Sequence, residues 1–546
     1  MYGYKEYEPL NKSVYEYMSS CADRYKEKTA ISYYGKVFTY EEMLERIENF
    51  ASALKSFGVG KNDVVASSLP GMPEGVFLIY AINKIGAVYC AFDCRSKGDE
   101  IKDMLDTFSP KLCFVPDFQV KEFRDVYDSA VVHISPVHCL GGFMRFSEAW
   151  ANFFRGRTLF YYKHKNFISY EKFISKCSCE SVSCEKSEGD VFGYFYTSGT
   201  TYGRKSVILT NENINAAVIQ QTKANEKIKA GGSILNIMPL FTCYSVTLAM
   251  HLPLINGVSI SLVPLVNTKK FKHLIIRHKP NYIITVPAHW EYFINEDFDG
   301  CDLSFLKTII VGGDSIDESY RKKLDDIFAG CKAEAKINVG YGLTETASTT
   351  TKEISGVTSV GSVGAPLGNT LVKIYDAQTD SFLPCGEKGE ICISGPTVCK
   401  GYYQDREMTK KLLRMHKDGR VWLHSGDIGY VDKNGSLFFC ERLKRMFVRF
   451  DGSKISPYSI EQSLLQCPVV KRCLVVAIND KAHSHGKCAK AFVVLQDNVK
   501  KAVAKKILDN FIKANLDEHM LPGEIEIVEK LPYTKNGKLD YFGSDK

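Results

Sequence analysis

The sequence lacks the features that identify several large classes of protein. It has no block of lysines and arginines like those of nucleic-acid-binding arms, and its 70 basic and 63 acidic residues leave a net charge of only +7. We therefore expect no nucleic-acid partner, although the small positive excess fits an anionic small molecule such as a nucleotide. Internal repeats and low-complexity tracts are also missing. Residues 1–18 include acidic side chains and no apolar core segment, so we expect no signal peptide.

Long uninterrupted apolar runs are scarce as well. The most apolar stretch, Val246–Val266, contains His251, Pro253 and Asn256. A helix that crosses a bilayer tolerates such residues poorly. We therefore expect no membrane span, and predict a buried helix followed by a strand in this stretch.

The 18 cysteines show no disulfide-framework spacing. In a long chain without a secretory signal, such cysteines are expected to be reduced thiols in the core. Cys177, Cys179 and Cys184 cluster without a matching fourth ligand nearby, so a structural zinc site is the less favoured interpretation. The working class is a cytoplasmic enzyme.

A chain of 546 residues is too long for one ordinary domain, so two or more structural units are expected. Helical and strand-like periods alternate along much of it, which is typical of an α/β architecture with parallel strands. Gly58 is placed to end the first helix. The predicted elements are helices at Met43–Phe57, Glu74–Ile85 and Glu318–Phe328, and strands at Val64–Leu69, Ala87–Phe92, Ile283–Val286 and Thr308–Val311.

The pattern changes between Leu371 and Phe439, where short β-rich runs separated by Gly, Asn and Asp turns indicate a meander or small barrel. After Arg442 a βα pattern returns over about 100 residues, a normal size for a small domain. The predicted domains are residues 1–443 and residues 444–546. The predicted fold class is α/β: a large N-terminal domain of layered α/β sheets plus a small β-barrel, and a smaller α+β C-terminal domain. Segment 116–188 supports no functional inference.

The first chemical motif is Tyr196–Val207, where the hydroxyl residues Thr197, Ser198, Thr200 and Thr201 and two glycines stand beside Arg204 and Lys205. Glycines let backbone N–H groups approach an anion, and hydroxyls donate further bonds to phosphate oxygens. An ordinary Ser/Thr-rich turn is the structural alternative. A Walker loop fails on spacing, because only three residues separate Gly199 from Gly203 and a strand rather than a helix follows.

Three further motifs are individually modest. In Asn338–Thr346, Tyr341 can stack on a base and Glu345 can hold Mg²⁺, although a tight turn ending a strand fits equally well. In His424–Asp427, the carboxylate and the later Arg442 suit a ribose diol, although Asp after Gly is commonly only a turn. Near the C-terminus, Lys538 follows Asn-Gly in a tight turn from which it can reach into a site.

In this order and at this spacing, the motifs resemble the adenylate-forming superfamily, which includes acyl-CoA synthetases, adenylation domains of nonribosomal peptide synthetases, and firefly-type luciferases. The resemblance runs from Lys28–Ile31 to Lys538 and is closest to the acyl-CoA synthetase branch. The family's phosphate loop, T-S-G-T-T-G-x-P-K-G, matches Thr197–Ser206. Tyr202, Arg204 and Ser206 stand where the loop has Gly, Pro and Gly.

The resemblance implies specific roles for the motif residues. It implies that Glu345 binds Mg²⁺, that Lys538, Thr344 and Glu345 are catalytic, and that the C-terminal domain rotates about a hinge at Lys444. The implied acyl pocket is Phe241, Thr242, Gly312 and Gly340, and Gly452 lines the tunnel for coenzyme A. The implied ATP- and AMP-binding residues are Thr197, Ser198, Gly199, Thr200, Thr201, Lys205, Gly313, Asp314, Tyr341, Gly342, Asp427 and Arg442.

The implied reaction needs ATP, Mg²⁺ and coenzyme A. A carboxylic acid is first adenylated, and the acyl group is then passed to the thiol, because AMP is a better leaving group than oxide. Where peptide-synthetase domains hold a substrate ammonium with Asp, this chain has Thr242, which favours a non-amino acid of fatty or aryl type. Two alternatives stay open: a freestanding adenylation enzyme that loads a carrier protein, and a non-catalytic nucleotide-binding relative.

Overall fold

The computed structural model describes residues 8–123, 130–140, 166–178, 182–183, 189–197, 205–225, 227–264, 267–314, 316, 318–354, 356–480, 483, 486–497, 499–532 and 539–541. The chain divides into two compact units. The first comprises Met1–Thr358, Val363–Leu371 and Ile393–Leu423, and the second comprises Ser359–Ser362, Val372–Cys392 and His424–Lys546. Among the described residues, no helix combines the length and the apolar character that crossing a bilayer requires.

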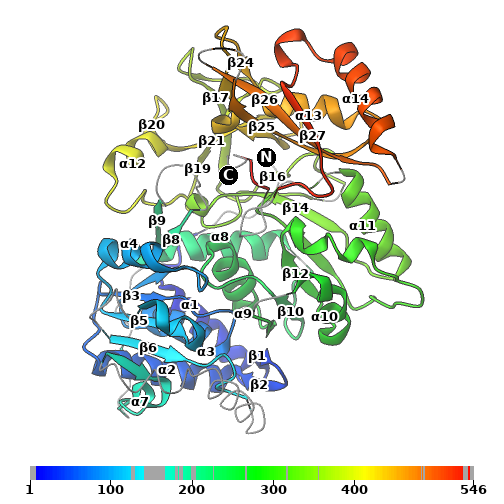
Figure 1. The fold of residues 1–546 in the computed structure, drawn as a ribbon. Helices are drawn as coiled ribbons and strands as arrows, with labels where there is room; N and C mark the ends of the chain where they lie inside the picture. Colours follow the sequence, from blue (N-terminus) through cyan, green and yellow to red (C-terminus); the bar gives the residue numbers. More distant parts are fainter. Residues whose placement is uncertain are drawn as a thin grey trace. The chain divides into compact units, whose positions relative to one another are not determined.

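The first unit contains a seven-stranded sheet whose strands are parallel except for the last pair, β8 and β9. Its central strands are buried on both faces, as expected when helices cover a parallel sheet. In Figure 1 they occupy the blue and cyan part of the chain. The strand order is β7 (Phe167–Ser169), β6 (Ala130–Ile134), β5 (Leu112–Pro116), β3 (Val64–Ser67), β4 (Val88–Ala91), β8 (Val191–Tyr196) and β9 (Ser206–Thr210).

The first unit also contains a nine-stranded sheet, with a parallel centre and antiparallel pairs at both ends. Because the central strands are parallel, their carboxyl ends lie at one edge, where α/β proteins commonly bind ligands. The strand order is β16 (Ala365–Pro366), β15 (Thr351–Lys352), β14 (Ile337–Tyr341), β13 (Thr308–Val311), β12 (Tyr282–Thr285), β10 (Ser233–Asn236), β11 (Ser259–Leu262), β1 (Thr29–Tyr33) and β2 (Lys36–Thr39).

Five of the described helices of the first unit, α1, α2, α7, α8 and α12, begin at a residue whose side chain caps the helix. Thr39 and Glu42 form a reciprocal capping box at the start of α2, and Gly58, with φ of +75°, follows its end. The helices are α1 (Val14–Ala22), α2 (Tyr40–Ser56), α3 (Pro73–Lys84), α4 (Gly98–Phe108), α7 (Tyr170–Ile174), α8 (Asn211–Ala224), α9 (Leu252–Ile255), α10 (Phe271–His278), α11 (Glu318–Gly330) and α12 (Arg406–Leu412).

The apolar stretch that begins at Val246 forms a buried helix and then strand β11, as predicted, but its first part, η3 (Ser245–His251), is a π-helix. His251 ends η3 and is fully buried. Its Nε2 lies 3.1 Å from Asn215 Oδ1, which can only accept, so Nε2 carries the proton. Its Nδ1 accepts from the Tyr80 hydroxyl at 3.0 Å. Burial lowers the pKa of His251 to about 3, so the ring is neutral.

This neutral histidine predicts acid sensitivity of the first unit. The unfolded His251 protonates near pH 6.5, whereas the folded ring resists protonation down to about pH 3. The free energy of unfolding should therefore fall as the pH is lowered through this window, and the loss due to His251 should be about 3 kcal/mol near pH 4. His251→Gln should flatten the acid limb of the unfolding free energy measured by urea titration between pH 7 and pH 4. His273→Gln changes an exposed histidine of the same unit and should leave that limb unchanged. If the unfolding free energy had the same slope against pH in the native protein and in both variants, His251 would not be the source of the acid sensitivity.

The second unit is built from antiparallel strands followed by an α+β segment. Helices α13 and α14 pack their apolar faces on the last three strands through residues such as Ile460, Val475 and Leu508. Most of its strand residues belong to β17 (Leu371–Asp376), β18 (Ser381–Phe382), β19 (Gly389–Ser394), β21 (Val421–Val431), β22 (Leu437–Arg442), β23 (Phe447–Val448), β24 (Lys454–Ile455), β25 (Val470–Asn479), β26 (Lys487–Leu495) and β27 (Glu524–Ile527); its helices are α13 (Pro457–Leu465) and α14 (Lys501–Asn515).

The predicted fold class, a large α/β part with a smaller second part, is confirmed. Helix Glu318–Phe328 is α11, and strand Thr308–Val311 has the predicted bounds. The division at residue 443 stays a prediction. The cysteines of the described residues are free thiols, most of them buried. Of the clustered cysteines, Cys179 and Cys184 lie outside the described residues.

Candidate functional site

The predicted phosphate loop connects the antiparallel strands β8 and β9. Tyr196 pairs with Ser206, and the Thr197 amide donates to the Lys205 carbonyl at 2.9 Å. Thr197 and Lys205 therefore face each other at the loop end of the hairpin. The intervening candidates Ser198, Gly199, Thr200 and Thr201 lie outside the described residues. As predicted, a strand follows the loop.

Lys205 is joined to Glu345 through Tyr402, a residue that the sequence did not single out. The Lys205 ammonium lies 4.7 Å from the centroid of the Tyr402 ring, within cation–π range. The Tyr402 hydroxyl donates to Glu345 Oε1 at 2.8 Å. Burial raises the pKa of Tyr402, and the neighbouring Glu345 carboxylate raises it further. The phenol therefore stays protonated and remains a donor.

Backbone contacts hold Tyr402 in this position. Its segment lies beside β9, because the Ile208 amide donates to the Gly401 carbonyl and the Lys400 amide donates to the Ile208 carbonyl. The Cys399 amide also donates to the Glu345 carbonyl at 2.9 Å. Burial raises the pKa of the Cys399 thiol to about 12, which makes it a poor nucleophile. The segment therefore ties the hairpin to Glu345 through main-chain bonds.

Glu345 and Thr344 project from a tight turn after strand β14. The turn needs glycine at position 342, because a Cβ there would lie 1.7 Å from the Ser348 carbonyl oxygen. Thr344 and Glu345 are both partly buried. A carboxylate with one oxygen fixed by Tyr402 is the hard oxygen ligand that Mg²⁺ prefers, so Glu345 fits the predicted metal role.

Gly312, Gly313 and Asp314 follow β13, the parallel neighbour of β14. The carboxyl ends of the two strands meet at one edge, which places this segment beside the Tyr341–Glu345 turn. The Tyr244 hydroxyl donates to the Thr285 carbonyl at 3.3 Å and would lie 3.2 Å from a Cβ on Gly312. Tyr244 therefore lies against this glycine. On β14, a Cβ added to Gly340 would lie 2.8 Å from the Thr351 carbonyl oxygen.

Phe241 and Thr242 precede the π-helix η3. The Thr242 hydroxyl donates to the Pro239 carbonyl at 3.0 Å and accepts from the Ser245 amide at 3.2 Å, so it caps the chain entering η3. The Arg95 guanidinium lies 5.9 Å from the Phe241 ring centroid. Thr242 thus has a structural role, and offers no carboxylate to a substrate ammonium.

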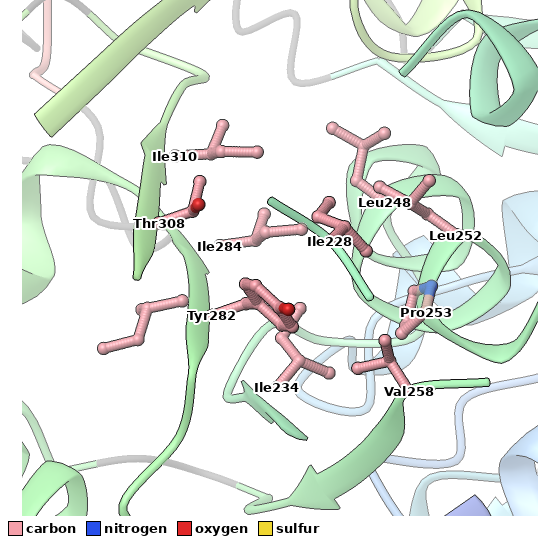
Figure 2. A pocket seen from close by; sticks show the side chains of 11 residues that line it. Ile228, Ile234, Leu248, Leu252, Pro253, Val258, Tyr282, Ile284, Thr308 and Ile310 are labelled. Atoms are coloured by element: carbon pink, nitrogen blue, oxygen red, sulfur yellow. The ribbon is translucent and has the colours of Figure 1, made fainter. Parts of the chain in front are cut away.

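Near these residues lies an apolar seam, a set of side chains packed between η3 and α9 on one side and β12 and β13 on the other. It contains a cavity of about 10 Å³, which has room for at most one water molecule. Figure 2 shows side chains from η3 and α9 facing side chains from β12 and β13 across it. Tyr282 and Thr308 are the lining residues with hydroxyls, and the Tyr282 hydroxyl already donates to the Lys227 carbonyl and accepts from the Lys229 amide. The lining comprises Ile228, Ile234, Leu248, Leu252, Pro253, Val258, Tyr282, Ile283, Ile284, Thr308 and Ile310.

Asp427 and Arg442 are brought together in the second unit. They are partners across the β21–β22 ladder, with Arg442 Nε 3.6 Å from Asp427 Oδ1. The Asp427 side chain is 4% exposed and that of Arg442 is 50% exposed. The motif lies within strand β21, so the interpretation of Asp427 as a mere turn residue is wrong. A buried carboxylate beside an accessible cation suits a ribose diol.

The remaining candidates also belong to the second unit. Lys444 is exposed in the short 3₁₀ turn Leu443–Arg445. Its neighbour Arg445 is buried and forms an ion pair of 2.5 Å with Glu461. Gly452 lies in the turn between β23 and β24 with φ of +83°, a conformation that favours glycine. Lys538 lies outside the described residues.

Two sequence families match the chain. Residues 18–403 match the family described as AMP-binding enzyme, and residues 459–538 match the AMP-binding enzyme C-terminal domain. The chain is similar to a long-chain-fatty-acid–CoA ligase of Bacillus subtilis (strain 168), with 27% identity over 97% of this chain and 93% of the relative. It is also similar to 4-coumarate–CoA ligase 1 of Solanum tuberosum, with 26% identity over 92% and 88%.

The fold is similar to that of a solved structure, ATP-bound MatB from Rhodopseudomonas palustris. The TM-score is 0.81 at 20% identity, and the match covers 97% of each chain. The predicted resemblance to adenylate-forming enzymes is therefore confirmed at the level of sequence family and fold.

Proposed function

Because the chain belongs to the AMP-binding enzyme family, we propose that it is an ATP-dependent acid–CoA ligase. It joins a carboxylic acid to coenzyme A through an acyl-adenylate and releases pyrophosphate and AMP. The observation that carries the proposal is the connection from Lys205 through Tyr402 to Glu345 at the phosphate-loop hairpin. The CoA ligases that it resembles over more than nine-tenths of its length support coenzyme A as the thiol.

In the first step, a carboxylate oxygen bonds to the α-phosphorus of ATP, the bond to the β-phosphate breaks, and pyrophosphate leaves. Both partners are anions, so the site must neutralise and align them. We assign the outgoing phosphates to Lys205, Thr197 and the hydroxyls of the loop. Glu345 would hold Mg²⁺, which supplies positive charge at the phosphate oxygens. Lys538 is assigned to the α-phosphate and the substrate carboxylate, and Asp427 and Arg442 to the ribose.

In the second step, the thiol sulfur bonds to the acyl carbon, the bond to the AMP oxygen breaks, and the thiol loses its proton. We propose that residues 444–546 rotate about Lys444 between the two steps, which withdraws Lys538 and brings Gly452 to the thiol tunnel. The exposed position of Lys444 beside the anchored Arg445 supports this role, because one residue can turn while the next is held.

We further propose that the acid is aliphatic. The apolar seam begins two residues before Gly312, at Ile310, and about one helical turn after Tyr244, at Leu248. Its lining presents no charge to a second polar group on the substrate. The seam is nearly closed, so an acyl tail enters it when η3 separates from the strands.

Enlarging the seam should change chain-length preference. Ile310→Ala removes side-chain carbons from the lining, and each further substrate methylene that is buried should raise kcat/KM about fourfold. The ratio of kcat/KM for a longer acid over a shorter one should therefore rise. Ile309→Ala is the matched control, because Ile309 is buried in the cluster on the other face of β13. An equal shift in both variants, or no shift in Ile310→Ala, would remove the seam from the acyl site.

The acceptor is tested by supplying coenzyme A and a pantetheinylated carrier protein in parallel, with the acyl product measured for each. We expect the thioester of coenzyme A. Acylation of the carrier alone would identify a freestanding adenylation enzyme instead.

A further inference from the structure

We propose that Glu390, Cys392 and His424 form a zinc-binding site in the second unit, separate from the Mg²⁺ ligand Glu345. One donor atom from each of the three residues lies within 4.8 Å of the others. The His424 Nδ1 atom lies 2.8 Å from Glu390 Oε2 and 3.5 Å from Cys392 Sγ. The proposal rests on this convergence of nitrogen, oxygen and sulfur, and does not depend on the ligase reaction.

The sheet positions these donors before any ion arrives. Glu390 and Cys392 are two residues apart on β19, so their side chains project from the same face of the strand. His424 lies on β21, the neighbour of β19 in the sheet. Because three donors are fixed by two hydrogen-bonded strands, little conformational entropy is lost when they bind a metal.

One of the two distances agrees with the geometry of tetrahedral zinc, and the other is shorter. Zinc–nitrogen, zinc–sulfur and zinc–oxygen bonds imply nitrogen-to-sulfur and nitrogen-to-oxygen separations of about 3.5 Å and about 3.4 Å. The His424–Cys392 distance already equals the first value. The His424–Glu390 distance is that of a direct hydrogen bond, so Glu390 must retreat by roughly half an ångström to admit the ion.

The surroundings have the features of a metal site with one open position. Cys392 is fully buried and the His424 side chain is 2% exposed, whereas Glu390 is 15% exposed and provides a route from solvent. The Gly426 amide donates to Glu390 Oε1 at 2.9 Å, which orients the carboxylate. The Tyr375 ring packs against the imidazole at an interplanar angle of 86°, with centroids 4.9 Å apart. Three protein ligands leave the fourth position to water.

The donor set selects zinc over magnesium. Thiolate and imidazole are softer ligands than those that Mg²⁺ prefers, whereas Zn²⁺ and Co²⁺ accept sulfur, nitrogen and oxygen together. On binding, the Cys392 thiol releases its proton to solvent, and the thiolate and the Glu390 carboxylate then balance the charge of the ion.

The test uses the full chain after chelator treatment, without ATP or Mg²⁺. Titration with Co²⁺ should give one bound ion with thiolate-to-cobalt charge-transfer absorption, and Zn²⁺ should displace it. Cys392→Ser should abolish that absorption and weaken zinc binding at least about tenfold. Cys440→Ser, at another buried cysteine in the same unit, should retain both.

Glu390→Gln provides a second variant that keeps the thiol and the approximate shape of the side chain. It should bind zinc more weakly while keeping the thiolate absorption. The proposal fails if the native chain shows no thiolate–cobalt absorption, or if that absorption survives in Cys392→Ser. It also fails if Cys392→Ser and Glu390→Gln both bind zinc as tightly as the native chain.

Discussion

Replacing Glu345 with glutamine should slow acyl-adenylate formation by roughly 10²–10³-fold, the usual cost of removing one group that stabilises charge in a transition state. The substitution keeps an acceptor for the Tyr402 hydroxyl but removes the negative charge that we propose attracts Mg²⁺. The apparent affinity for Mg²⁺ should fall with the rate. The measurement is single-turnover adenylation at a series of Mg²⁺ concentrations, with transfer from pre-made acyl-AMP to coenzyme A followed separately.

Tyr402→Phe is the graded control for this prediction. It leaves the Glu345 charge in place and removes only the hydroxyl that fixes one of its oxygens. We expect a smaller loss of rate than in Glu345→Gln, with the ring still available to Lys205. A Glu345→Gln enzyme with an unchanged Mg²⁺ dependence would show that the metal is held elsewhere.

Replacing Lys538 with alanine should reduce adenylation by a similar factor, roughly 10²–10³-fold, and largely spare the transfer of the acyl group from pre-made acyl-AMP. The reason is that the lysine is needed in only one of the two proposed orientations of the C-terminal domain. Its neighbours Leu539 and Tyr541 pack on Leu474 and Val476 of β25, so truncation of the lysine should leave the domain folded.

Lys530→Ala is the matched control, because Lys530 is an exposed lysine eight residues earlier in the same unit. It should not alter either half-reaction. If Lys538→Ala slowed both half-reactions equally while the fold stayed intact, the role assigned to the lysine would be wrong.

Sequence periodicity predicted the local elements well because their signals are local. The apolar spacing from Met43 to Phe57 and the glycine that follows are sufficient to place α2. The π-helical hydrogen bonding of η3 was not predictable in this way, because an apolar stretch buried on all sides has no period to distinguish i→i+5 from i→i+4 bonds.

Long-range contacts explain why the sequence did not reveal Tyr402 or the cluster of Glu390, Cys392 and His424. Tyr402 is 57 residues after Glu345 and reaches it only because its segment runs beside β9. Glu390 and Cys392 meet His424 across a sheet, with over thirty residues between them, so no compact spacing marks the cluster. By contrast, Asp427 and Arg442 were paired correctly because a single hairpin brings β21 and β22 together.

Carboxylate-dependent adenylation can be measured as ATP–pyrophosphate exchange without coenzyme A, using a panel of carboxylic acids. We expect exchange that depends on a straight-chain aliphatic acid and is absent with amino acids or with no acid. Absence of exchange with every acid, in a protein that is folded and binds ATP, would contradict it and leave a non-catalytic nucleotide-binding protein.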